Sequence, residues 1–198
     1  MSYRKPTLCA AVALGYDPGV VGFEAIILVG HGGLPSDAPG QLVSELKGLE
    51  AARRARGVPE MGAREAELDE MIREWPRTKE TDPYKFGLET LLDELRPKLH
   101  GRKVVEAYNE FCKPSVEDAI ARLVDEGASR ITLLTTMFTR GGSHAEFEIP
   151  ETVEHARTRH TGVEIEYVWP FDLSRVAHFL ASHVPPPQST SPDSGVAK

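Results

Sequence analysis

Two histidines and one glutamate stand out because each follows a segment that is predicted to form a β-strand. His31 lies in Gly30-His31-Gly32-Gly33, directly after an apolar run, and Glu110 and His144 follow two later apolar segments. Imidazole and carboxylate groups together suit a divalent first-row metal ion. The same groups also suit proton abstraction near neutral pH. These residue types therefore predict metal binding, acid–base chemistry, or both.

Each of the three residues, taken alone, has a simpler interpretation. A histidine in a glycine turn is about as often a surface residue as a ligand. Glu110 could cap a following helix, and His144 could be an ordinary loop histidine. The combination is harder to explain in this way, because both histidines are flanked by glycines after a predicted strand.

The elements that would position these residues alternate along the chain. Four strands are predicted at 24–30, 103–108, 130–138 and 163–169, with helices predicted between and after them. This alternation indicates an α/β fold of three layers, in which a parallel sheet of about four strands carries helices on both faces. The carboxyl ends of parallel strands meet at one edge, where open sheets bind ligands. We therefore expect His31, Glu110 and His144 to converge.

The first strand is separated from the next strong helix signal, at Asp82-Pro83, by a long polar stretch. Residues 34–81 contain two amphipathic patterns and are predicted to be a helical insertion. Within it, the cluster Arg53-Arg54-x-Arg56 is most simply a solvated face, with contact to an anionic ligand as the alternative. We expect a single α/β domain over 23–184, an N-terminal extension over 1–22, and a disordered Pro/Ser-rich tail over 185–198.

Composition and charge narrow the class of protein. The net charge of −7 disfavours nucleic acid and anionic membranes as partners. No stretch approaches the roughly 18 apolar residues of a membrane span. The two cysteines, Cys9 and Cys112, form no CxxC pair, which favours a reducing compartment. We expect a cytoplasmic protein. We also expect no organic cofactor, since phosphate-cradling glycine motifs and a nucleophile elbow are absent from the sequence.

Three motifs give the chain a resemblance to sirohydrochlorin chelatases of the CbiX type, which belong to the class II tetrapyrrole chelatases. They are Val29-Gly30-His31-Gly32, Ala107-Tyr108-Asn109-Glu110, and Gly141-Gly142-Ser143-His144 running into Glu148-Ile149-Pro150-Glu151. The resemblance covers about residues 24–184. It implies a chelatase fold and insertion of Co²⁺, Fe²⁺ or Ni²⁺ into a sirohydrochlorin-like tetrapyrrole. It also implies that His31 and His144 are metal ligands and that Glu110 is a ligand or proton acceptor.

A flat macrocycle with acidic side chains needs aromatic walls and cations. By their position, Phe138 is a candidate wall, and Arg140 with Gly141 and Gly142 could hold an anionic group. The chain has one α/β module where larger chelatases have two. We therefore expect the cleft to form between two subunits of a homodimer.

The chain departs from the family pattern at three places. The insertion at 34–81 is longer than in the short chelatases, Asn109 replaces an apolar residue, and Glu148 stands where aspartate is frequent. Two other functions stay open at this point. One is a non-catalytic protein that binds metal or tetrapyrrole, and the other is a metal-dependent hydrolase or lyase that uses the same residues.

Overall fold

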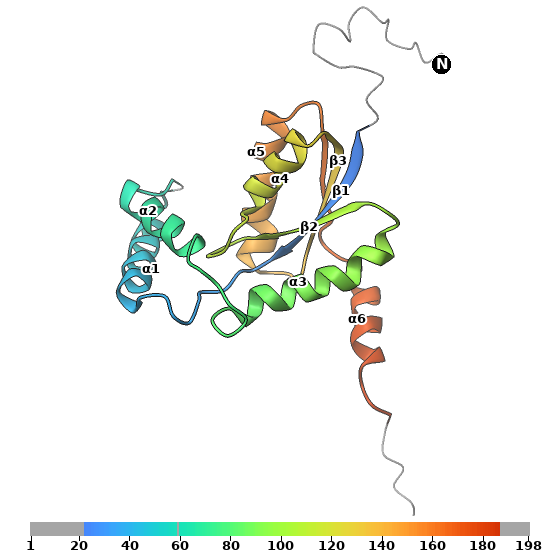
Figure 1. The fold of residues 1–198 in the computed structure, drawn as a ribbon, viewed down its shortest axis with the longest axis horizontal. Coiled ribbons are helices and arrows are strands. Elements are labelled where there is room, and N and C mark those ends of the chain that lie inside the picture. The colour runs from blue at the N-terminus through green and yellow to red at the C-terminus, as the bar shows by residue number, and fades with distance from the viewer. Residues whose placement is uncertain (1–21, 59, 187–198) are drawn as a thin grey trace, which may run out of the picture.

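A four-stranded parallel sheet forms the centre of the computed structural model, which describes residues 22–58 and 60–186. The strand order is β2-β1-β3-β4 (Figure 1). The strands are β1 (Phe23–Gly30), β2 (Lys103–Tyr108), β3 (Ala128–Thr135) and β4 (Glu164–Tyr167). The predicted α/β fold with a parallel sheet is confirmed.

Helices lie on both faces of the sheet, as expected. The helical elements are α1 (Gly40–Ala55), α2 (Ala63–Arg73), α3 (Pro83–Leu95), η2 (Arg96–Leu99), α4 (Val116–Asp125), η3 (His144–Glu148), α5 (Ile149–Arg159) and α6 (Leu173–Ser182). One face packs on α4 and α5 through a core that includes Ile27, Ile120 and Ile149. The other face packs on α3 through a second core that includes Leu28 and Leu92.

Local sequence explains where the main elements begin and end. From Ala25 to Gly30 every residue of β1 is buried, as expected for a central strand covered on both faces. Helix α3 begins as predicted, since the Asp82 carboxylate accepts a hydrogen bond from the backbone N–H of Lys85. Helix α4 begins two residues after Pro114, because Ser115 and Asp118 form a capping box there.

Strand β3 is shorter than expected and ends at Thr135 instead of residue 138. The Thr135 hydroxyl accepts a hydrogen bond from the backbone N–H of Met137, and this local bond follows directly on the last residue of the strand. The segment that leads to His144 is therefore a longer loop than the sequence suggested.

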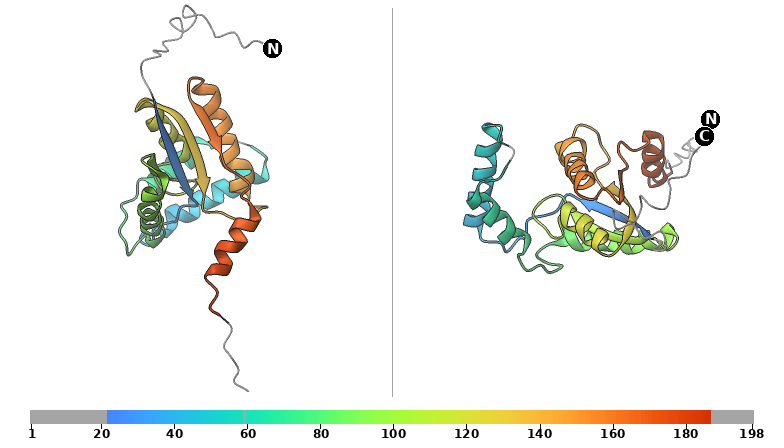
Figure 2. Two further views of the ribbon diagram at one scale, coloured as in Figure 1. Left: turned by 90° about the vertical axis from the view of Figure 1, so that its right-hand side faces the viewer. Right: turned by 90° about the horizontal axis from the view of Figure 1, so that it is seen from above.

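The predicted helical insertion after the first strand is present as α1 and α2, which lie to one side of the sheet (Figure 2). These helices have a small core of their own, centred on Leu46, Leu68 and Ile72. Phe111, from the loop after β2, packs against this core. The insertion is therefore joined by packing to the loop that carries Glu110.

Two largely buried arginines, Arg73 and Arg77, also connect the insertion to the loops after β1 and β2. Arg77 forms an ion pair with Asp82, and both side chains are almost fully buried, with 5% and 1% of their surface exposed. The same guanidinium donates hydrogen bonds to the carbonyl groups of Gly33 and Phe111. Arg73 donates to the carbonyl groups of Asn109 and Cys112. Four carbonyl groups in the loops after β1 and β2 are thus held from one side.

Some expectations fall outside what the structure describes. The expected extension over 1–22 and tail over 185–198 lie outside the described residues, apart from Gly22, Pro185 and Pro186. Within the described ranges, no helix has the length and apolar character needed to cross a bilayer.

Gly32 provides a test of how tightly the loops after β1 and β2 fit together. It has a φ of 93°, and a Cβ added there would lie 1.8 Å from the carbonyl oxygen of Glu110. We expect Gly32→Ala to lower the free energy of unfolding by about 3 kcal/mol or more, from backbone strain and this clash. The measurement is urea unfolding. The control, Gly48→Ala in α1, meets open space and should raise stability by about 0.5–1 kcal/mol. A Gly32→Ala variant as stable as wild type would contradict this packing.

Candidate metal centre

The pairing of β1 with β2 positions the first two residues of the site. Two backbone hydrogen bonds join the chain segments just past both strands: the N–H of Asn109 donates to the carbonyl of Gly30 (3.0 Å) and the N–H of Glu110 donates to the carbonyl of His31 (2.8 Å). These bonds place His31 and Glu110 at neighbouring positions on the carboxyl edge of the sheet. The His31 Nε2 atom lies 4.0 Å from Oε2 of Glu110.

The ring of His31 is oriented by its own loop. Its Nδ1 atom lies 2.8 Å from the carbonyl oxygen of Gly32, a contact that requires the proton to be on Nδ1. The backbone N–H of His31 donates to the hydroxyl of Tyr84 on α3 (2.7 Å). With Nδ1 acting as a donor, the lone pair of His31 is on Nε2, the atom that faces Glu110.

His144 comes from the opposite side of the site, at the start of the π-helical turn η3 that runs into α5. Its Nδ1 atom lies 2.8 Å from Oε2 of Glu148, one turn further along. The Asn109 amide lies 2.9 Å from the same Glu148 oxygen and 2.9 Å from Nδ1 of His144. We assign the Nδ1 proton to His144, because both it and the amide can then donate to the carboxylate. The lone pair of His144 is then on Nε2, which lies 3.8 Å from Oε1 of Glu110.

Together, His31, Glu110 and His144 form a compact set of metal-capable atoms. One ligand atom from each residue lies within 4.8 Å of the others, and this is the metal-capable group found among the described residues. The two imidazole rings meet edge to face, with centroids 4.7 Å apart. His31 keeps 42% of its side-chain surface exposed, whereas Glu110 and His144 keep 17%. The set therefore offers three ligands and remains open to solvent on the His31 side, the arrangement of a site that accepts a further ligand.

Burial dominates the electrostatics of Glu110. It raises the pKa of this carboxyl above its ordinary value, and the nearby His144 and His31 only partly oppose that shift. For Glu148, burial alone would also raise the pKa. Hydrogen bonds from His144 and Asn109 outweigh burial and bring the pKa of Glu148 below its ordinary value. The two carboxyl groups are thus differentiated, with Glu148 the more firmly ionised and Glu110 the readier proton acceptor.

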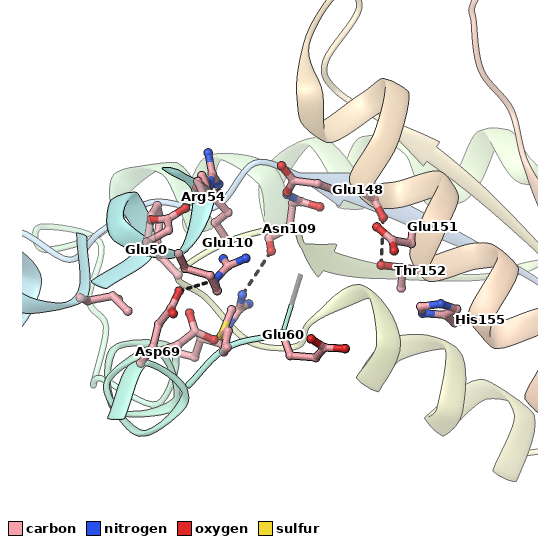
Figure 3. Close-up of a pocket in the computed structure, with 16 residues that line it drawn as sticks. Glu50, Arg54, Glu60, Asp69, Asn109, Glu110, Glu148, Glu151, Thr152 and His155 are labelled. Carbon is pink, nitrogen blue, oxygen red and sulfur yellow. Dashed lines mark hydrogen bonds and ion pairs between the residues drawn. The ribbon is translucent and has the colours of Figure 1, made fainter. Parts of the chain in front are cut away.

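A cleft of about 670 Å³ adjoins Glu110 and separates the insertion from α5 (Figure 3). Arg54 and Glu50 of α1 border it on one side, and Glu151 and His155 of α5 border it on the other. The described lining residues include seven carboxylates and three arginines. An excess of negative charge in a concave site raises the local concentration of cations.

The structure does not bring all of the sequence candidates to this cleft. The described residues that line it include Glu110 but not His31, His144, Phe138, Arg140, Gly141 or Gly142. The N–H of Gly141 donates to Oε1 of Glu146 (2.9 Å), and Nε of Arg140 lies 3.8 Å from the same oxygen. An internal carboxylate therefore already faces the donors that we expected to bind an anion. Phe138 packs edge to face with Phe171, at a centroid distance of 5.9 Å.

Sequence reasoning missed three residues that contact the predicted ligands. Glu148 and Asn109 were noted only as departures from a family pattern, although both contact His144. The spacing of four residues between His144 and Glu148 on a helix is a signal that could have found this pair. Arg54, from the insertion, lies 3.5 Å from Oε1 of Glu110. Nothing in the local sequence distinguishes it from the neighbouring arginines.

Comparison with known families adds a separate finding. The CbiX family model matches residues 79–182, which is more than half of the chain. This chain belongs to the CbiX family. The matched segment contains Glu110 and His144, whereas His31 and helices α1 and α2 precede it. The insertion of this CbiX protein is thus outside the part that the family model describes. The comparison with curated proteins returned no match.

Solved structures similar to this CbiX protein include two bacterial chelatases and one further CbiX protein. The sirohydrochlorin chelatase SirB of Bacillus subtilis subspecies spizizenii, solved with cobalt, is 17% identical, with a TM-score of 0.44 over 81% of this chain and 51% of that chain. A CbiX protein of Marinobacter aquaeolei VT8 is 17% identical, with a TM-score of 0.43 over 80% of this chain and 94% of that chain. SirB of Bacillus subtilis with Fe³⁺ is 18% identical, with a TM-score of 0.43 over 82% of this chain and 48% of that chain. The chain spans about half the length of the two Bacillus chelatases.

The raised pKa of Glu110 predicts a pH-dependent stability effect. Between its ordinary value and the raised one, the folded protein binds more protons than the unfolded chain, so this carboxyl makes stability fall as pH rises. Glu110→Gln removes that effect. We expect the variant to be more stable than wild type at pH 7–8, with the difference shrinking as pH falls toward about 4. Thermal unfolding across this pH range measures it.

The control for this comparison is Glu117→Gln on α4, where the glutamate side chain is 61% exposed. Its stability difference from wild type should be small at every pH. A Glu110→Gln variant that is less stable than wild type at neutral pH would show that the ionised carboxylate stabilises the fold, contrary to our expectation.

Proposed function

We propose that this protein is a sirohydrochlorin-type chelatase, a lyase that inserts Co²⁺, Fe²⁺ or Ni²⁺ into a tetrapyrrole. The observation that carries the proposal is the convergence of His31, Glu110 and His144 beside an open cleft in a chain of the CbiX family. The cobalt and Fe³⁺ described for the two Bacillus chelatases support a metal of this kind. The metal is a substrate in this reaction, and no organic cofactor takes part.

The donor set suits a metal that must be held and then released. Three nitrogen and oxygen ligands bind a divalent ion less firmly than a closed thiolate site does. Glu148 and the Gly32 carbonyl fix the Nδ1 protons of the two histidines and leave each Nε2 free to coordinate. The exposed side of His31 leaves room for the incoming macrocycle.

Metal insertion also needs a base, because two pyrrole N–H protons leave as the metal enters the macrocycle, one to a protein carboxylate and the other to solvent at the exposed His31 side. Glu110 is the candidate, since its pKa is raised by burial and lies nearer to neutral pH than that of an ordinary carboxyl. Its two oxygens face His31 and His144 respectively. In this position it serves as metal ligand and proton acceptor in the same site.

The macrocycle would need an apolar wall and groups that bind its acidic side chains. We retain Phe138 for the wall, because it belongs to an exposed aromatic group with Phe171 and Phe179. We also retain Arg140, Gly141 and Gly142 as an anion-binding loop. In that role, a substrate carboxylate takes the place of Glu146.

Metal insertion by the purified protein is the direct test of this function. Metal-free protein mixed with sirohydrochlorin and Co²⁺ should accelerate the absorbance change of insertion over a protein-free control. We expect His144→Ala to lower the rate at least about 100-fold, since a ligand is lost. Glu148→Gln should lower it about 10–100-fold, because the carboxylate that orients His144 is lost. The control, Glu154→Gln, changes an exposed residue of α5 and should keep the wild-type rate.

Two results would favour the alternatives. Tight binding of metal or tetrapyrrole without acceleration by Co²⁺, Fe²⁺ or Ni²⁺ would indicate a carrier or sensor. Stoichiometric zinc that survives dialysis would indicate a metal-dependent hydrolase or lyase. An unchanged rate in His144→Ala would show that the three-residue set is not the site.

We also propose that the protein is a homodimer, and a cytoplasmic one. Helix α6 contributes no buried residue, and its apolar side chains Leu173, Phe179 and Leu180 are 52–60% exposed. In Figure 2 it projects away from the sheet. Helix α3 covers one sheet face over β1 and β2, whereas Leu134 of β3, on the same face, is only half-buried. A second copy could cover these apolar surfaces reciprocally.

A charge on the apolar side of α6 tests the dimer. We expect wild type to have the mass of a dimer in light scattering at micromolar concentration, and Leu180→Glu to shift it toward monomer, because a buried unpaired charge is costly. His178→Glu places the same charge on the opposite side of this helix and should leave the dimer intact. A monomeric wild-type protein would contradict the proposal.

A further inference from the structure

Arg54 is the point at which the insertion reaches the candidate metal centre. It lies in the last turn of α1, and its Nη2 atom lies 2.5 Å from Oε1 of Glu50 and 3.5 Å from Oε1 of Glu110. The Arg54 side chain is 52% exposed, whereas that of Glu110 is 17% exposed. A solvent-accessible cation therefore contacts one of the least accessible carboxylates of the cleft.

The oxygen that Arg54 contacts is also the one that a metal would use. Oε1 of Glu110 faces Nε2 of His144 at 3.8 Å, so a metal shared by these two residues binds this oxygen. A divalent ion there and a guanidinium 3.5 Å from the same oxygen repel each other strongly in a partly buried site. Metal and Arg54 consequently compete for Glu110. When the metal binds, Glu50 can still hold the guanidinium near the cleft.

The other arginines of the cleft have different contacts. Arg53 pairs with the buried Glu65 (2.8 Å) and also contacts the carbonyl of Val58. Arg73 pairs with Asp69 (2.6 Å) and donates to two carbonyl groups of the loop after β2. Both side chains are at least 85% buried. Among the arginines described as lining the cleft, Arg54 is the exposed one, and its ion pairs are with Glu50 and Glu110.

We propose that Arg54 is an exchangeable cation. It balances Glu110 while the metal is absent, and it binds an acidic side chain of the tetrapyrrole once metal occupies Glu110. This inference rests on the proposed chelatase function for the identity of its carboxylate ligand. It assigns a specificity role to the insertion, which lies outside the segment that the family model matches.

The test compares Arg54→Ala with Arg56→Ala, a matched control from the end of the same helix. Arg56 is the C-cap residue of α1, and its Nε donates to the carbonyl of Ala52 on the same helix. In titrations with Co²⁺ alone, Arg54→Ala should bind the metal about two- to five-fold more tightly than wild type, because a competing exposed ion pair is lost. Arg56→Ala should bind it as wild type does.

Insertion kinetics test the second half of the exchange. At saturating Co²⁺, Arg54→Ala should raise the KM for sirohydrochlorin about tenfold, the effect of one charge-assisted hydrogen bond. Its kcat should stay close to the wild-type value. Arg54→Lys keeps the charge and should recover part of the KM loss.

The outcomes separate this inference from the proposed function. Unchanged Co²⁺ affinity in Arg54→Ala overturns the competition, and a KM that is unchanged, or equally raised in Arg56→Ala, overturns the role in macrocycle binding. If the wild-type protein catalyses no insertion, the chelatase proposal fails. The Co²⁺ titration then still decides whether Arg54 competes at Glu110. An absorbance titration with the macrocycle decides whether Arg54 binds it.

Discussion

The backbone pairing of β1 with β2 beyond the last residues of both strands is the constraint on which the site depends. Two backbone hydrogen bonds, from Asn109 to Gly30 and from Glu110 to His31, join the loops directly after the ladder ends. They fix the backbone of His31 beside that of Glu110, and the two side chains then lie 4.0 Å apart, from Nε2 to Oε2. Close approach of the loops also requires a glycine at position 32, because a side chain there would overlap the carbonyl oxygen of Glu110. The geometry of the site is therefore set mainly by the backbone.

The third residue depends on a different kind of constraint. His144 starts a π-helical turn, and its ring is held by Glu148 from the next turn, while Asn109 from the loop after β2 donates to the same Glu148 oxygen. Asn109 thus takes part in both constraints, since its backbone joins the two loops and its side chain contacts His144 and Glu148. A change at this residue is transmitted to all three corners of the site. This linkage explains why a polar residue fits here, since an apolar one could contact the ring but could not donate to Glu148, which orients the ring.

The sequence could predict the convergence of His31, Glu110 and His144, because parallel topology brings the carboxyl ends of strands to one edge whatever the side chains are. The spacing of four residues between His144 and Glu148 offered a signal for that pair. The role of Asn109 could not be predicted, because it depends on individual rotamers. The contact between Arg54 and Glu110 was also beyond reach, since it depends on how α1 docks. Phe138 and Arg140 follow β3 in the chain, and the early end of β3 at Thr135 places them in a longer loop, outside the described lining of the cleft.

The insertion and the candidate metal centre cannot vary independently, because they share one loop. Phe111 adopts a φ of 56°, a backbone conformation that residues other than glycine rarely take. Its ring packs on the core of α1 and α2. Arg77 and Arg73 bind carbonyl groups on both sides of Glu110. The strain at Phe111 persists only while packing and buried hydrogen bonds offset it. Loss of the insertion core would therefore release the loop and move Glu110 away from His144. In this chain the insertion is part of what holds the carboxylate in place, in addition to bordering the cleft.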